Sequence, residues 1–188
     1  MRKADERKAD TRQRIIEAAG VLFRQHGIDG VGVDAIMRTA GLTHGGFYGH
    51  FPSKEALVAD VSAASLARSA ARWERISQED SAPAALRRIA GSYLDPAHVA
   101  EVERGCVLTT LGPEVARRPE ARPRLTAAVR VMLAALRRCM PKAPPDAPAA
   151  ALATMVGAVV LARLVDDPTL AAGFLEDAKA AVLGQQAE

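Results

Sequence analysis

Two glycines, Gly27 and Gly41, divide the first sixty residues into short segments with helical spacing of apolar residues. The first segment carries the stripe Ile15, Ile16, Ala19, Leu22 and Phe23. It ends at His26, because Gly27 suits the left-handed position that follows many helices. Segments this short form a stable unit only when they share one apolar core and are joined by tight turns.

A second helix is predicted at about 34–40, and Gly41 ends it. Thr43 can cap a third, very short helix that runs to about His50. Three short helices with a glycine turn between the second and third predict a helix-turn-helix. Its core is expected from Val21, Phe23, Ile36, Ala40, Leu42, Phe47 and Phe51.

The rest of the chain continues the helical pattern without a strand pattern or a repeat. Ser53 can cap a long helix at 54–77, and further helices are expected at about 84–94, 106–117, 119–140, 149–165 and 168–183. Residues 2–12 are dense in both charge signs and are expected to fray. The fold class is therefore all-α with about nine helices: a helix-turn-helix domain at 1–53 and a helical bundle at 54–188, with 54–77 as the connector helix.

Composition excludes several other classes of protein. The two cysteines of this 188-residue chain make no disulfide framework and indicate a reducing, cytoplasmic compartment. The charged N-terminus is no signal peptide, and the apolar run 149–161 falls short of a membrane span. No catalytic motif or metal-ligand spacing is visible, so we expect no enzyme, cofactor, metal site or membrane partner. A net charge of +3 is too mild to indicate nucleic-acid binding by itself.

The third helix carries the side chains that indicate DNA as a partner. Thr43, His44, Tyr48 and His50 can reach phosphates and base edges from a helix in the major groove. Tyr48 could instead be a core aromatic, and His50 could be a structural histidine. Basic residues before Ile15 are either a solvated tail or extra DNA contacts.

The N-terminal sequence resembles the tetracycline-repressor (TetR) family of regulators. The similarity lies in IIEAAGVLFRQHGIDGVGVDAI (residues 15–36) and AIMRTAGLTHGGFYGHFPSKEAL (residues 35–57). The resemblance implies a homodimer, a palindromic double-stranded DNA operator, and a C-terminal body that dimerises and binds a small molecule. The positions expected at the DNA are Val33, Thr43, His44, Gly45, Tyr48, His50 and Lys54.

The recognition helix departs from the family pattern at its glycines. Gly49 stands where many members carry a large side chain, and Gly45 and Gly46 leave the helix thin. Fewer side chains can then reach the bases, so His44 is expected to carry more of the sequence specificity.

Small residues in the predicted helix 149–165 indicate a close helix contact. Ala150, Ala153, Gly157, Ala158 and Ala162 recur three or four residues apart, which lets a second helix approach closely. Together with the last helix, this one is expected to form a four-helix dimer interface. Burial within one chain is the alternative.

By the same resemblance, the effector pocket is expected in the body, and its ligand is expected to be apolar or weakly polar. The candidate lining residues, each of which could be ordinary core, are Trp73, Tyr93, His98, Cys106, Leu111, Met132, Leu136 and Met155. Cys106 follows Arg104 and begins a predicted helix, which would favour a reactive thiolate. The sequence therefore predicts a ligand-released repressor, with electrophile or oxidant sensing at Cys106 as the alternative and a constitutive architectural DNA-binding protein as a weaker one.

Overall fold

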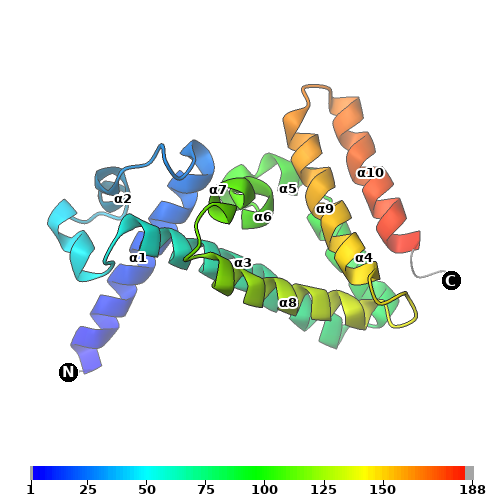
Figure 1. Cartoon of the computed structure of the whole chain (residues 1–188), viewed down its shortest axis with the longest axis horizontal. Coiled ribbons are helices and arrows are strands. Elements are labelled where there is room, and N and C mark those ends of the chain that lie inside the picture. The colour runs from blue at the N-terminus through cyan, green and yellow to red at the C-terminus, as the bar shows by residue number, and fades with distance from the viewer. Residues whose placement is uncertain (1, 185–188) are drawn as a thin grey trace.

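A computed structural model describes residues 2–184, with side chains from residue 5 onward, and every regular element in that range is helical. Figure 1 shows a small head at one end, two long helices along the base, and an upright helix pair at the other end. The head contains α1 (Arg2–His26), α2 (Val33–Thr39) and the 3₁₀ helix η1 (His44–Gly49). The body contains α3 (Lys54–Glu79), α4 (Ala82–Tyr93), α5 (Pro96–Ala100), the 3₁₀ helix η2 (Val102–Arg104), α6 (Val107–Thr110), α7 (Gly112–Ala116), α8 (Arg122–Cys139), α9 (Ala147–Leu164) and α10 (Pro168–Gly184).

The all-α prediction is confirmed, and several boundaries differ from expectation. α1 is continuous from Arg2, so the prediction that residues 2–12 fray is wrong. Arg12 anchors this part of α1, since it pairs with Asp60 and lies over the Phe51 ring, 4.7 Å from its centroid. The predicted helix 106–117 is two short helices, because Gly112 and Pro113 begin a new one.

The glycines act in the head as the sequence predicts. Gly27 and Gly41 have φ values of 75° and 68°, the left-handed region that other residues rarely enter. Arg14 of α1 donates to the Ala40 carbonyl at 2.7 Å and so closes the end of α2. Phe23, Phe47 and Phe51 are fully buried in the shared core.

Val21 is the exception among the predicted core residues. Its side chain is 36% exposed, because it lines an open groove between α1 and α3 and is not enclosed by the shared core. Leu42 is only partly buried against the core. The helical stripe in the sequence therefore marks the correct helix but includes one residue from a second face.

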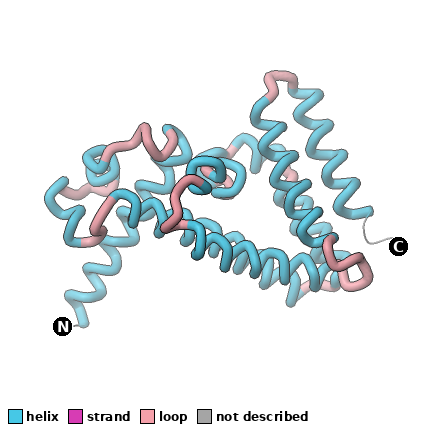
Figure 2. The backbone as a smooth tube through the Cα atoms, viewed as in Figure 1, coloured by secondary structure: helices cyan, strands magenta, loops and turns pink. Residues whose placement is uncertain are grey.

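The body is organised around α3. α8 lies along α3, and α9 packs antiparallel against α10 beyond their far end (Figures 1 and 2). Asp60 of α3 pairs with Arg12 of α1 and with Arg124 of α8, so α3 is tied to the head and to the body at one residue. The division at residue 53 remains a prediction.

Ser53 offers a test of how α3 begins. Its Oγ accepts from the Ala56 backbone N–H at 3.1 Å, which satisfies one of the free donors of the first turn. Ser53→Ala should lower the free energy of unfolding by about 1 kcal/mol. Ser81 occupies the same position before α4 without a side-chain cap, so Ser81→Ala is the matched control and should cost less. Equal losses in urea melts of the two variants would contradict this account.

Candidate DNA interface and effector region

η1 presents an exposed polar and aromatic surface. Tyr48 is 65% exposed, and its ring packs edge-on against the buried Phe47 ring at 5.3 Å between centroids. The His44 and Tyr48 rings lie 6.5 Å apart, so the structure brings these two predicted residues together. A Cβ at Gly45 would meet nothing within 4 Å, which leaves the backbone open to a large partner. This surface can approach a nucleic acid with side chains and backbone alike.

The other predicted DNA residues differ in exposure. Thr43 precedes η1 and is exposed, and Lys54 begins α3 and is half-buried. His50 is half-buried, and its buried Nδ1 atom has no hydrogen-bond partner among the described residues. Val33 begins α2 and packs partly against the core, so its backbone is the more accessible part.

The structure adds one feature of His44 and one further candidate. The His44 Nδ1 atom contacts the carboxylate of Asp34, an exposed residue in the first turn of α2. This contact orients the imidazole from α2 and η1 together. Arg38 is exposed in the last turn of α2 and forms no ion pair within residues 5–184, so its guanidinium is available to a phosphate. The sequence did not single it out, because one arginine in a short helix carries no periodic signal.

The basic residues before Ile15 divide into two sets. Arg12 and Arg14 are engaged inside the protein, through Asp60 and the Ala40 carbonyl. The side chains of Arg2 and Lys3 lie outside the described residues. The predicted basic arm therefore supplies fewer charges to DNA than its composition indicates.

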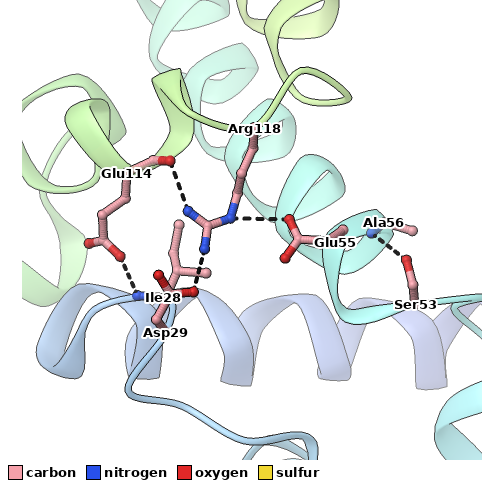
Figure 3. Close-up of polar contacts among 7 residues, drawn as sticks. All are labelled: Ile28, Asp29, Ser53, Glu55, Ala56, Glu114 and Arg118. Carbon is pink, nitrogen blue, oxygen red and sulfur yellow. Dashed lines mark hydrogen bonds and ion pairs between the residues drawn. The ribbon is translucent and has the colours of Figure 1, made fainter.

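Glu114 of α7 and Arg118, which follows α7, join the body to the head (Figure 3). The Ile28 N–H of the turn after α1 donates to Glu114 Oε2 at 2.8 Å. Arg118 donates to Asp29 in the same turn at 2.5 Å and to Glu55 in the first turn of α3 at 3.1 Å. Arg118 is only 14% exposed and also donates to the Glu114 carbonyl, so its position is fixed. Body and head are thus coupled by contacts that the sequence did not indicate.

Four of the predicted pocket residues form one connected cluster. The Trp73 and Tyr93 rings meet edge-on at 5.5 Å, and the Tyr93 and His98 rings meet at 4.8 Å. The Cys106 backbone N–H donates to His98 Nε2 at 3.3 Å. The remaining four candidates, Leu111, Met132, Leu136 and Met155, are buried in the core.

Hydrogen bonding defines the charge state of His98. Its Nδ1 lies 2.6 Å from the Tyr93 carbonyl oxygen, so Nδ1 carries the proton and Nε2 is left to accept from Cys106. Burial lowers the pKa of His98 below 6.5, and the Arg163 charge acts in the same direction. Burial, with a further contribution from Cys106, raises the pKa of Tyr93 well above its ordinary value. His98 and Tyr93 are therefore uncharged at neutral pH, which suits an apolar or weakly polar ligand.

A groove of about 420 Å³ lies between α1, α3 and η2, and none of the eight predicted pocket residues lines it. The predicted pocket in the body therefore stays a prediction. Cys106 and Cys139 are both buried, and neither forms a disulfide within the described residues. Burial raises the Cys139 pKa to about 11.

Two further findings concern the metal and membrane expectations. Within the described residues, no group of three or more His, Cys, Asp or Glu side chains is placed to hold a metal ion. α9 is 18 residues long with a mean hydropathy of 1.7, so by length and composition it could cross a membrane. The expectation that this apolar run is too short to span a membrane is therefore wrong as to its length. Its buried side packs against α8 and α10, as in the core helix of a bundle.

The head is similar in sequence to known bacterial regulators. Residues 15–61 match the family model described as bacterial regulatory proteins of the tetR family. The HTH-type transcriptional regulator AcrR of Shigella flexneri is 35% identical over 60 residues, which is 32% of this chain and 28% of AcrR. Residues 15–61 are therefore similar to the N-terminal domain of TetR-family regulators.

Solved structures of TetR-family and related regulators share the architecture of the whole chain. Reduced NemR of E. coli has a TM-score of 0.75 at 22% identity and covers 92% of this chain and 95% of its own. A TetR-family regulator of Agrobacterium tumefaciens reaches 0.76 at 20% identity, covering 94% and 97%. At these identities the likeness shows the fold alone. The AcrR match spans less than a third of that relative, so the activity and partners of this chain are proposals.

The charge state of His98 predicts a pH effect on stability. Because its pKa is lowered in the folded protein, the unfolded chain takes up the proton first as the pH falls below about 6.5. The contribution of neutral His98 to the free energy of unfolding is therefore complete above pH 6.5. It is lost as the pH falls towards the pKa of His98 in the folded protein. His98→Gln keeps a donor and an acceptor without titrating, so its free energy of unfolding should fall less steeply between pH 7 and 5. His26→Gln is the control for losing one histidine, and identical slopes in wild type and His98→Gln would refute the assignment.

Proposed function

We propose that this protein is a ligand-responsive transcriptional repressor that binds a palindromic DNA operator as a homodimer. The observation that supports it most is the exposed His44–Tyr48 surface on η1, inside a helix-turn-helix whose core is fully packed. Such an element enters the major groove with its first residues at the base edges. Lys54 and Arg38 flank it and supply positive charge for the phosphates.

The outer face of the α9–α10 pair supports the homodimer. Four large apolar side chains, Val160, Leu161, Leu164 and Leu170, are exposed there. Ala150, Ala153 and Gly157 share the outer face, whereas Ala158 and Ala162 are buried in the chain's own core. An apolar face of this kind on paired helices fits an isologous contact with a second copy.

Effector release requires that the body move the head. Glu114 and Arg118 contact the turn that precedes α2, and Arg118 also contacts the start of α3. A ligand among Trp73, Tyr93 and His98 would touch α3 and α4, and displacement of α3 would change the separation of the two recognition elements in a dimer. Such separation must match half-sites about 34 Å or a multiple apart.

Chemical sensing at Cys106 remains the alternative mode of release. The residue is 6% exposed, and its amide is held by His98, so reagent access requires the loop to open. Reversible ligand binding needs no such opening and is the mode we favour. A constitutive architectural protein would not need the neutral cluster in the body.

The DNA part is tested by selecting bound sequences from a random pool and measuring variants on the selected site. Lys54→Ala should weaken binding to all sequences and reduce the salt slope by about 1, because one phosphate contact is lost. His44→Ala should alter the preferred base at one position. Lys142→Ala, in the exposed loop before α9, is the control of equal charge. Selection of no palindrome, or no effect of Lys54→Ala beyond that of the control, would overturn the proposal.

The dimer is tested at Gly157. A Cβ at this position meets no atom of the rest of the chain within 4 Å, so this position on the outer face has room for a side chain that would reach a neighbouring molecule. Gly157→Leu should raise the dimer dissociation constant by about tenfold or more, as overpacking by ~1–3 kcal/mol would. Ala134→Leu, exposed on α8, is the control. Sedimentation that finds wild type monomeric at micromolar concentration would refute the dimer.

A further inference from the structure

The groove of about 420 Å³ between head and body has an unusual lining. α1 contributes Gly20, Val21 and Arg24, and α3 contributes Ser65, Arg68 and Arg72. The residues of each set are separated by no more than seven positions and lie on one face of their helix. Because both sets line the same groove, the two helix faces lie on either side of it. η2 and Gly105 close one end.

Arg24 is fixed in this groove by neutral partners alone. It donates to the Gly20 carbonyl at 2.6 Å, to the Gly105 carbonyl at 3.1 Å and to the Ser65 hydroxyl. These three bonds use three of the five N–H donors of the guanidinium. Burial lowers the pKa of Arg24, and the nearby Arg68 charge lowers it further. A buried cation held by carbonyls keeps its full charge for an added anion.

The groove lining carries more positive than negative charge, with four arginines and two glutamates. Four arginines line it, and within residues 5–184 none of them forms an ion pair. The two lining carboxylates accept hydrogen bonds from glutamines: Glu17 from Gln13 at 2.8 Å and Glu103 from Gln25 at 2.5 Å. Arginines at other sites, such as Arg118 and Arg88, do have carboxylate partners.

The groove also has room and an apolar wall. A side chain at Gly20 would lie 3.2 Å from an Arg24 Nη atom, so the glycine keeps the centre open. Val21, the apolar residue that the head core leaves exposed, lines the same space beside Ile16 and Val61. Cationic donors next to an apolar wall match a ligand with an anionic group on an apolar body.

We propose that this groove binds a small organic anion, whose carboxylate or phosphate is held by Arg24, Arg68 and Arg72 and whose apolar part lies against Val21. Guanidinium groups bind both kinds of oxyanion through paired hydrogen bonds. This site is separate from the predicted pocket in the body, and its existence does not rest on the proposed function. A ligand here would clamp α1 to α3.

The site also contacts the Cys106 loop through Gly105. The Gly105 carbonyl accepts from Arg24, and a Cβ on Gly105 would lie 2.9 Å from the Arg163 guanidinium. Arg163 of α9 in turn donates to the carbonyls of His98 and Val99 at 2.7 and 3.0 Å. An anion that binds Arg24 would therefore change the contact of Arg24 with Gly105. Gly105 precedes Cys106, whose backbone N–H donates to His98.

The test is isothermal titration calorimetry of the full chain, without DNA, at constant ionic strength. The ligands are benzoate, phenyl phosphate, inorganic phosphate and the neutral benzamide. We expect saturable binding of benzoate or phenyl phosphate and no binding of benzamide. The ligand with the higher affinity identifies the preferred oxyanion. Arg68→Gln/Arg72→Gln should weaken it by about tenfold or more, because two charge-assisted contacts are lost. Both residues are exposed, so the variant should fold, and circular dichroism checks this.

Arg130→Gln/Arg87→Gln is the matched control, since both arginines are exposed on other helices, and it should bind as wild type does. Equal affinity in the groove variant and wild type would overturn the proposal, as would binding of benzamide or failure of both organic anions. Binding of inorganic phosphate alone would reduce the groove to an ion site and overturn it as well. If the groove variant instead weakens DNA binding and leaves anion binding unchanged, these arginines serve DNA phosphates and the proposal is wrong.

Discussion

The continuous α3 helix is the constraint on which the rest of the structure depends. At 26 residues it spans about 39 Å, long enough to touch the head at one end and the far loops of the body at the other. Its buried residues occupy more than one face, because α1 packs on it near its start and α8 packs along its length. Any shift of the body that moves α3 must therefore move the head, unless the Ser53 cap or the Asp60 ion pairs give way.

The arginines that connect the head and the body bind two kinds of partner, carboxylates and uncharged acceptors. Arg118 joins the body to the head through the carboxylates of Asp29 and Glu55, whereas Arg24 and Arg163 hold backbone carbonyls and hydroxyl groups. Exposed ion pairs contribute little to stability, so the buried donors to carbonyls define the loop geometry around Gly105 more strictly. A cation bonded only to neutral acceptors also stays attractive to an anion. The same residue type thus serves both rigidity and the proposed recognition of ligands.

The head was predictable because its signals are local. Gly27 and Gly41 indicate positions of positive φ, and Ser53 indicates a helix N-cap. Phe47 and Phe51 are spaced four residues apart, as on one face of a helix. Val21 was misassigned because a stripe in sequence does not say where a second partner helix lies. The 3₁₀ form of η1 and the short helices α5 and η2 were missed for a related reason: segments of three to six residues have too few turns for a periodic pattern to emerge.

The sequence by itself determined the all-α class, the helix-turn-helix and the resemblance of the head to TetR-family regulators, since these follow from residue type at fixed spacing along one chain. Only the tertiary structure decided which charges meet. Glu114 and Ile28 are 86 residues apart, and Arg24 and Gly105 are 81 apart, and no local pattern encodes such pairs. Whether a cation is neutralised depends on every element packed around it, because Coulomb interactions and burial act through space and not along the chain. The neutral cluster at His98 and the arginine groove exist for that reason only in the folded protein.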